Sequence, residues 1–185
     1  MFIRKKTIKK NEYAYLVKNR WKKKGKKGIA KQKNLKYLGK VLNLGKSNFY
    51  SLKEELSDYK DIIKNILIGQ LLEKGFVCEK KNVYKRSIED EIAIVDLGKK
   101  NVFSENSFRK LVLQLNEGFL CDFTIKRLFK FRYYGEENEE LGYVIADLML
   151  SAGIRPTKEQ FVAIVKNMLK QLREEKEKAR KKLLD

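Results

Sequence analysis

The sequence contains no histidine, and that absence removes several kinds of active site. Nucleophilic Ser-His and Cys-His sites, an imidazole general base and every zinc pattern that uses histidine depend on that side chain. The two cysteines, Cys78 and Cys121, lie 43 residues apart in the 185-residue chain and form no C-x-x-C pair. We expect buried thiols in a reduced compartment rather than a disulfide. Carboxylate chemistry remains open, and the composition implies no cofactor and no metal ion.

The sequence also has a single proline and no tract rich in serine, glycine or proline, so a long flexible linker is not expected. Apolar runs such as residues 66–68 are far too short to cross a bilayer. Residues 1–5 are followed by charge rather than by an apolar stretch, which predicts no signal peptide. These features predict a folded cytoplasmic protein with no membrane partner.

Negative charge is nearly absent from the first 46 residues, which hold 17 Lys or Arg and one acid, Glu12. The other 139 residues hold 26 bases and 23 acids, so the formal charge is +16 for residues 1–46 and +3 for residues 47–185. So concentrated a field is expected to attract a dense polyanion. Heat-adapted proteins also gain lysine, but their acids rise with their bases. That explanation fits residues 47–185 and does not fit the first 46.

Aromatic residues are interleaved with this charge, and they include Trp21, the only tryptophan of the chain. Rings give a basic surface something to stack against a base or a ribose. The sequence therefore predicts a nucleic-acid-binding surface in residues 1–46, with Trp21 or Tyr15 as the stacking residue. The residues expected to form this surface are Arg4, Lys5, Lys6, Arg20, Trp21, Lys22, Lys23, Lys24, Lys26, Lys27, Lys31, Lys33 and Lys36.

Residues 1–46 are predicted to form a basic three-stranded β-meander. Residues with high β-propensity predict strands over 2–8, 12–18 and 29–38. The glycines of Trp21–Gly28 favour an exposed hairpin loop, and Gly39 is expected to end the third strand. Three such strands bury little on their own, so the meander is expected to dock on the residues that follow.

Within this segment an aromatic strand (Tyr13–Val17), a basic loop (Arg20–Lys27) and a third strand ending in Tyr37-Leu38-Gly39 follow one another. This order resembles the short amino-terminal module of some insertion-sequence transposases and of uncharacterised archaeal proteins that share it. The resemblance covers about a quarter of the chain, and it implies a β-module that contacts nucleic acid. A DDE catalytic domain is not recognisable in the residues that follow, so the resemblance does not imply a free-standing transposase.

Residues 47–185 are predicted to form a mostly helical domain with a small β-sheet, so the whole chain is expected to be α+β. Capping boxes, an N-cap and C′ glycines predict helix ends at Ser51, Gly75, Asp122, Gly153 and Thr157. The helix beginning at Asp122 is expected to reach Phe131. Strands are predicted over 76–86 and 91–103, and residues 111–115 fit a strand or a helix equally.

One stretch resembles in outline the core of restriction-endonuclease-like nucleases: a helix, a strand, Asp90, the strand Ile92–Asp96 and a further strand. Such sites need an acid and an acid-x-Lys pair on adjacent strands to hold Mg²⁺. Here Lys99 follows Asp96 one residue late, and Glu105 has no lysine two residues on. A sheet with acids at its turns is the favoured interpretation. A divergent nuclease is the least favoured alternative, and the protein is not expected to be an enzyme.

A second basic cluster falls on the helix predicted after Asp122, and we call Lys126, Arg127 and Lys130, with Arg132 beside them, the secondary basic patch. It could grip phosphates, or the acids at 136–140 could neutralise it. The predicted function is non-catalytic nucleic-acid binding, with RNA slightly ahead of DNA because interleaved rings suit unpaired or A-form RNA. The transposase-like resemblance favours DNA. The alternative is an adaptor whose apolar carboxy-terminal helices recruit a protein partner.

Overall fold

The computed structural model describes residues 1–24, 27–47, 58–133 and 140–181, and the side chains of all of these except 22–24, 27–28 and 178–181. It confirms the α+β class, with two sheets and four helices in this part of the chain. The strands are β1 (Phe2–Ile8), β2 (Asn11–Lys24), β3 (Lys27–Gly45), β4 (Val77–Lys80), β5 (Val83–Ile88), β6 (Glu91–Asp96), β7 (Asn101–Ser104), β8 (Leu111–Leu115) and β9 (Gly118–Leu120). The helices are α1 (Tyr59–Glu73), α2 (Asp122–Phe129), α3 (Glu140–Ala152) and α4 (Lys158–Lys181).

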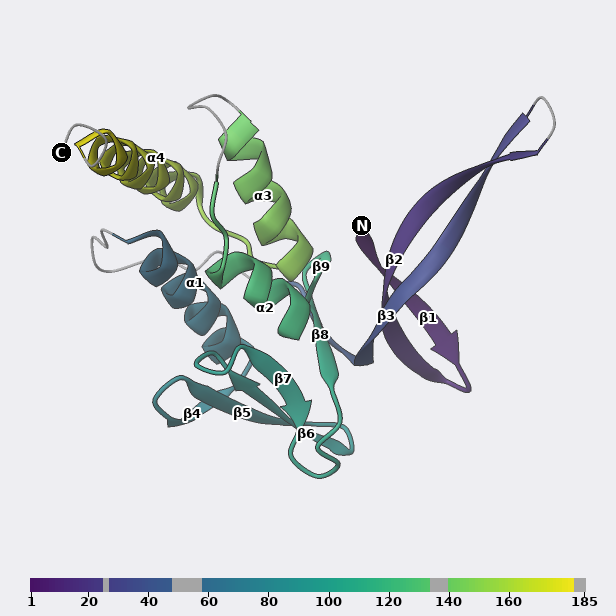
Figure 1. Cartoon of the computed structure of the whole chain (residues 1–185). Coiled ribbons are helices and arrows are strands. Elements are labelled where there is room, and N and C mark those ends of the chain that lie inside the picture. The colour runs from purple at the N-terminus through teal and green to yellow at the C-terminus, as the bar shows by residue number, and fades with distance from the viewer. Residues whose placement is uncertain (25–26, 48–57, 134–139, 182–185) are drawn as a thin grey trace.

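Five strands form the first sheet in the order β1-β2-β3-β8-β9 (Figure 1). Strands β1, β2 and β3 are antiparallel neighbours and correspond to the predicted meander. Strand β3 then pairs in parallel with β8, from Lys40 opposite Leu111 to Gly45 opposite Leu115. It ends close to the expected boundary at residue 46, but its partner comes from beyond that boundary. The meander and the second predicted unit therefore share one sheet.

The prediction that Gly39 ends the third strand is wrong. Strand β3 continues to Gly45 through two β-bulges, at which Leu35 and Leu38 are left without a partner in β2. Gly39 has a φ of 147°, and a Cβ there would collide with the main-chain carbonyl of Lys110. The glycine permits a close approach between β3 and the residue before β8, and the chain does not reverse there.

The predicted hairpin loop over Trp21–Gly28 is also wrong, because most of it is strand. Strand β2 continues to Lys24 and β3 begins at Lys27, and these two residues are the last registered pair. Lysine and glycine have low β-propensity, which favoured a loop. Antiparallel pairing uses backbone groups, however, and does not depend on those side chains. The result is a two-stranded ribbon that projects from the rest of the molecule (Figure 1).

The second sheet is an antiparallel meander in the order β4-β5-β6-β7, and it confirms the strands predicted over 76–86 and 91–103. The ambiguous segment 111–115 is strand β8. Glu91 of β6 connects the two sheets: its carboxylate lies 3.4 Å from Lys40 Nζ of β3 and accepts a bond from Ser104 Oγ of β7 at 2.5 Å. The small sheet is therefore held to the first one by buried or half-buried polar contacts.

Most predicted helix ends are confirmed. Gly75 and Gly153 follow α1 and α3 with φ of 74° and 77°, as C′ glycines do. Thr157 and Gln160 exchange the two bonds of a capping box at 2.8 and 3.2 Å. Helix α1 begins at Tyr59 after the N-cap Asp58, whose carboxylate accepts the Lys60 amide. The start predicted at Ser51 falls on residues that the structure does not describe.

The N-cap predicted at Asp122 is wrong, because Cys121 occupies that position and Asp122 is the first helical residue. The Asp122 carboxylate accepts the amide of Val102 in β7 at 2.9 Å, so a tertiary bond replaces the local cap. Cys121 donates its amide to Thr124 Oγ1 at 3.0 Å, and helix α2 ends at Phe129 rather than Phe131.

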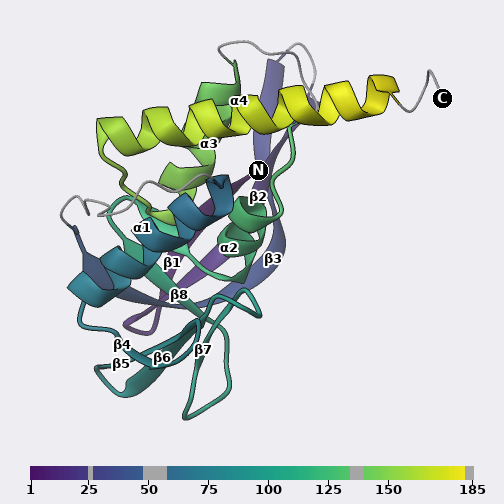
Figure 2. The same ribbon diagram turned by 90° about the vertical axis from the view of Figure 1, so that its left-hand side faces the viewer.

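The main core lies among the four helices, β8 and the small sheet, and Tyr59 in it donates to the Leu128 carbonyl at 3.2 Å. Helix α4 runs across this layer, and its last turns extend beyond it (Figure 2). A smaller cluster joins the meander to α2 and β8 through Ala14, Leu16, Leu38, Val41, Val112 and Cys121. As expected, Cys121 is buried, whereas Cys78 is exposed and the prediction for it is wrong. Among the described helices, none is both long and apolar enough to span a membrane.

Candidate nucleic-acid interface

The projecting ribbon is strongly basic, since residues 18–24 and 27–33 include eight Lys or Arg and no acid. Strand β1 pairs with β2 only as far as Val17, and past that residue β2 and β3 are registered with each other. We call residues 18–24 and 27–33 the arm. Seven residues of extended strand span roughly 23 Å. Within the arm, Lys18 lies opposite Lys33 and Arg20 lies opposite Lys31.

The two faces of the arm differ in chemistry because side chains alternate along a strand and opposite residues share a face. Lys18, Arg20, Lys31 and Lys33 share what we call the inner face, and all four are exposed. Closer to the body this face continues as Lys36, which lies opposite the buried Leu16. The outer face of the arm carries Asn19, Trp21, Ala30 and Gln32. A two-stranded ribbon twists strongly, so both faces turn as the arm extends.

The inner face places like charges directly opposite each other, which destabilises a strand pair. A two-stranded hairpin is marginal even without that repulsion. Lys24 and Lys27 form a third like-charged pair in the register. A polyanion bound along the arm would remove the repulsion, so this arrangement favours a ligand with closely spaced negative charges.

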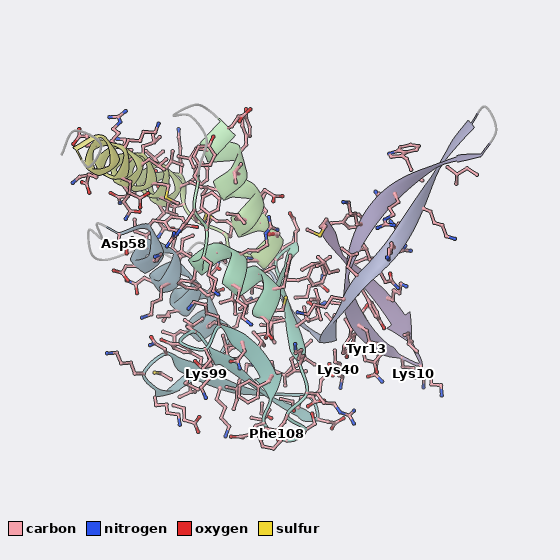
Figure 3. All side chains as sticks on the ribbon, viewed as in Figure 1. Lys10, Tyr13, Lys40, Asp58, Lys99 and Phe108 are labelled. Carbon is pink, nitrogen blue, oxygen red and sulfur yellow. The ribbon has the colours of Figure 1, made fainter. Side chains whose placement is uncertain are left out.

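The outer face carries rings at the base of the arm, where Figure 3 labels Tyr13. The Tyr37 ring lies 6.2 Å from Tyr13 and 5.5 Å from Tyr15, and Lys6 Nζ lies 5.2 Å above Tyr15. Burial, and then the neighbouring Tyr13 and Tyr15, raise the pKa of Tyr37. Trp21, farther out on the arm, is 77% exposed. Rings beside cations on a sheet surface are suited to stacking on bases.

Some residues of the predicted surface make contacts within the protein itself. Lys5 Nζ lies 2.8 Å from Glu12 and 3.0 Å from the Gln114 side chain, so it connects β1 to β2 and β8. Arg4 donates to the Gln32 side chain on the outer face. The predicted lysines at 22–24 and 26–27 have side chains that the structure does not describe. Their positions in the register, apart from 26, place them at the distal end of the arm.

The secondary basic patch lies next to the meander, and the sequence did not predict this proximity. Lys36 of β3 and the patch line one open groove of about 500 Å³ between β3, α2 and α3. We call it the α2 groove. Its lining is Lys36, Asp122, Phe123, Lys126, Arg127, Lys130, Phe131, Arg132, Val144 and Leu148. Lys36 and a basic group that begins 90 positions later in the sequence thus face the same space.

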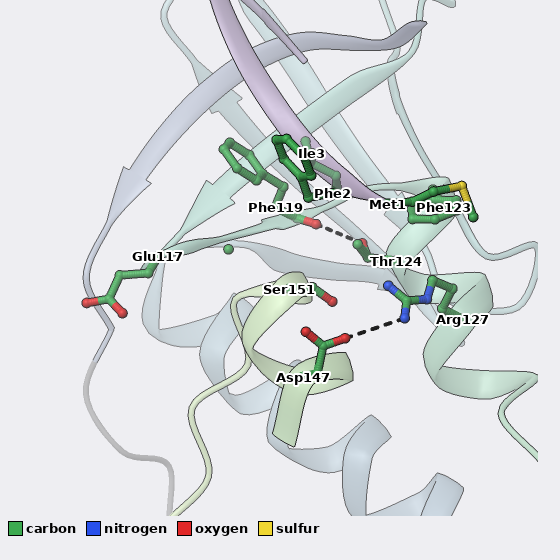
Figure 4. Close-up of a pocket in the computed structure, with 11 residues that line it drawn as sticks. Met1, Phe2, Ile3, Glu117, Phe119, Phe123, Thr124, Arg127, Asp147 and Ser151 are labelled. Atoms are coloured by element: carbon green, nitrogen blue, oxygen red, sulfur yellow. Dashed lines mark hydrogen bonds and ion pairs between the residues drawn. The ribbon is translucent and has the colours of Figure 1, made fainter. Parts of the chain in front are cut away.

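Charge in the α2 groove is strongly unbalanced. Among its described lining residues Asp122 is the one acid, and it already accepts the Val102 amide and lies 3.6 Å from Lys110. Arg127 lies 3.5 Å from Asp147 and over the Phe123 ring, 5.6 Å from its centre. Behind Arg127 is a smaller cavity of about 200 Å³, next to Phe2 and Ser151 (Figure 4). The acids at 136–139, expected as possible neutralising partners, lie outside the described residues.

Sequence reasoning missed Lys18 and Tyr37 as surface residues of this interface. Lys18 follows the period-2 alternation that also places Arg20, so strand periodicity was the available signal. Tyr37 was visible as one of the interleaved rings, but its contact with Tyr13 and Tyr15 depends on the cross-strand register and its bulges. The approach of Lys36 to Lys126 and Lys130 had no sequence signal.

Asp96 lies apart from Asp90 and Glu105, the other two acids considered for a nuclease site. Asp96 and Glu105 lie at opposite ends of the β6–β7 hairpin, because Asp96 pairs with Asn101 while the Glu105 amide bonds to Ile92. Asp96 accepts the Lys99 amide at 2.9 Å. Glu105 lies 2.5 Å from Lys85, and this hydrogen bond raises the pKa of the lysine. Across the described residues no group of three acids or cysteines is placed to hold a metal ion.

Comparison with protein-family models, with curated proteins and with solved structures found no match for this chain.

Proposed function

We propose that this protein binds nucleic acid through the arm without cleaving it, with RNA slightly favoured over DNA. The observation that carries the proposal is the paired cations of the inner face, Lys18 with Lys33 and Arg20 with Lys31. These pairs destabilise an isolated ribbon and match a polyanion. The outer-face rings support RNA, since unpaired bases stack on exposed aromatic side chains.

The register allows the arm to be removed at a paired position, with the loss of the contact between Arg4 and Gln32. Val17 lies opposite Asn34, so replacing residues 18–33 by Asn-Gly would close the hairpin with a two-residue turn. We expect this arm-replacement variant to fold and to lose most of its affinity for structured RNA, single strands and duplex DNA, measured by fluorescence anisotropy. Affinity equal to that of the unmodified protein would refute the proposal. Parallel incubations with Mg²⁺ or Mn²⁺ should leave every substrate uncut.

The salt dependence of binding tests phosphate contact by the distal lysines. Serine at Lys22, Lys23, Lys24, Lys26 and Lys27 should weaken all nucleic acids nearly equally, because phosphate contacts carry no sequence information. Neutralising five contacts would reduce the log–log salt slope for duplex DNA by roughly 4 to 5 units. A matched control with serine at Lys60, Lys80, Lys81, Lys99 and Lys158 removes the same charge away from the arm. Equal slopes for the two variants would show that the distal lysines do not contact the ligand.

A second candidate function is that of an adaptor, and one observation favours it. Helix α3 exposes Tyr143 and Leu150 to 75% and 60%, on the helical layer rather than on the arm. Such residues suit a protein partner that would be brought to the bound nucleic acid. Serine at both positions should leave nucleic-acid affinity unchanged and abolish retention of that partner on the immobilised protein.

A further inference from the structure

The α2 groove continues the line of cations that begins on the arm. Lys36 lines the groove, and the next pair on the same face is Lys18 with Lys33, followed by Arg20 with Lys31. Within the arm, successive cations of one strand face are two residues apart, or roughly 6.6 Å, and the bulge at Leu35 adds one residue between Lys33 and Lys36. A ligand strand lying on the inner face therefore meets α2 where it reaches the body of the protein.

Helix α2 presents its basic side chains to the groove because its opposite face is buried. Ile125 and Leu128 are fully buried in the main core, whereas Lys126 and Lys130 are exposed and one helical turn apart. Within the described residues, no carboxylate lies at ion-pair distance from Lys36, Lys126, Lys130 or Arg132. Four of the five cations that line the groove thus pair with no described carboxylate, and the one described acid of the lining is already bonded elsewhere.

The groove also offers apolar surface between the cations. Phe123, Phe131, Val144 and Leu148 contribute to its lining. The Phe131 ring is held in place by Tyr59 and Tyr133, whose ring centres lie 6.3 and 6.5 Å away. A ring fixed in this way can stack on a base with little loss of side-chain entropy, and the planar guanidinium of Arg127 can do the same.

We propose that the α2 groove binds an unpaired segment of the nucleic-acid strand held by the arm, with phosphates on Lys126, Lys130 and Arg132 and a base over Phe131. This inference rests on the proposed function of the arm, and it adds that the segment of the ligand in the groove is single-stranded. Its support is the combination of cations that pair with no described carboxylate, the fixed Phe131 ring and a volume that suits one small ligand. RNA and DNA share this chemistry.

Size distinguishes an unpaired strand from a duplex. A groove of about 500 Å³ lies within the range of sites that take one small organic ligand. One nucleotide falls in this class. A duplex presents its bases inside a stack, and its major groove alone is about 12 Å wide. It could contact the rim of the α2 groove through phosphates, but it could not place a base on Phe131.

The experiment compares three variants of the full chain. The groove variant carries K126S, K130S and R132S, and we leave Arg127 unchanged because it already pairs with Asp147. The control variant carries K80S, K81S and K99S, which remove the same charge from exposed positions on the small sheet, where Figure 3 labels Lys99 far from the arm. The third is the arm-replacement variant. Each is tested with oligouridylate and oligothymidylate of about 12 nucleotides and with a blunt DNA duplex.

We expect the groove variant to lose about tenfold in affinity for the single strands and less than about twofold for the duplex, relative to the control variant. Equal losses for single strands and duplex would overturn the assignment to an unpaired segment. If the groove variant binds single strands like the control while the arm-replacement variant does not, the inference fails and the proposed function stands. If the arm-replacement variant binds normally, the proposed function fails. A loss confined to oligouridylate would assign the site to RNA, and a loss with both would assign it to the shared backbone.

Discussion

Individual residues hold the β8–β9 turn to the end of α3. Asn116 has a φ of 53°, and its side-chain amide accepts the Ser47 amide at 2.8 Å and donates to the Gly153 carbonyl at 2.7 Å. Gly118, two residues later, packs directly on the backbone of α3, since a Cβ there would overlap the Leu150 carbonyl oxygen and the Gly153 amide. Both residues therefore serve packing, and the turn needs no functional explanation.

Gly118→Ala should destabilise the protein strongly. The added methyl meets main-chain atoms of α3, which cannot move away as a flexible side chain would. Overpacking of this kind costs about 1–3 kcal/mol, and we expect the upper end of that range. The measurement is the free energy of unfolding in urea.

Gly142→Ala is the matched control. Gly142 lies in α3, the helix on which Gly118 packs, and a Cβ there has no heavy atom within 4 Å. It should stabilise the protein by about 1 kcal/mol, the difference in helix propensity between the two residues. Similar unfolding free energies for the two variants would mean that the turn does not approach α3 as closely as described.

Trp21→Ala should leave the fold intact and weaken binding to single strands. Trp21 is 77% exposed on the arm, so it contributes little to the core, and we expect unfolding free energies within about 0.5 kcal/mol. If it stacks on a base, its loss costs about 1–3 kcal/mol of binding. Trp21→Phe keeps a ring and should retain most of the affinity. Unchanged binding of oligouridylate by Trp21→Ala would remove Trp21 from the interface.

At the scale of the element, the arm combines weak intrinsic stability with high charge. Its strands have no further described neighbour past Val17, and its opposite residues repel each other. Binding and stability should therefore respond in opposite directions to a change of charge on one strand. This coupling distinguishes a ligand-binding ribbon from a merely solvated one.

Lys31→Glu with Lys33→Glu tests this coupling. Each change converts a like-charged pair into an opposite-charged pair, with Arg20 and Lys18, and should stabilise the arm by about 0.2–1 kcal/mol per pair. Amide hydrogen exchange in the arm should slow, while affinity for nucleic acid falls. Serine at the same two positions is the control, since it removes repulsion without adding attraction. Faster exchange in the glutamate variant would contradict the register.

Elements with a local signal were predictable from the sequence, and those fixed by distant contacts were not. Gly75, Gly153 and the Thr157 capping box marked helix ends because each feature acts within one turn of its helix. The role of Gly39 was not predictable, because it depends on Lys110, which is 71 positions away. Cys121 replaced Asp122 as N-cap because the carboxylate is used by β7.

The candidate site likewise has features that the sequence predicted and features that depend on distant contacts. Charge counting located the basic surface in residues 1–46, because charge asymmetry is a property of composition. The division of the arm into a basic face and an aromatic face needed the register of β2 with β3. The α2 groove needed the parallel pairing of β3 with β8, which brings Lys36 beside Lys126 and Lys130.

For the whole molecule, the parallel pairing of β3 with β8 determines whether the two predicted units can exist apart. Leu38, Val41 and Leu42 of β3 are buried, and Leu42 belongs to the main core among the helices. Strand β8 reads Leu-Val-Leu-Gln-Leu and is buried at four of its five positions. It would become an uncovered edge without β3, and exposed apolar edges promote aggregation.

We therefore expect residues 47–185 alone to lose cooperative unfolding and to aggregate, even though they contain the four described helices. Each of the large buried side chains removed with β3 withdraws about 1.5–3 kcal/mol of hydrophobic stabilisation, a large part of the stability of a typical domain. The arm-replacement variant is the control, because it keeps β3 from Asn34 onward and should unfold cooperatively near the midpoint of the full chain. Circular dichroism during urea unfolding, with light scattering, measures both properties. Cooperative unfolding of residues 47–185 at the full-chain midpoint would show that the meander is a separable domain, and binding by that shortened chain could then be assigned to α2 alone.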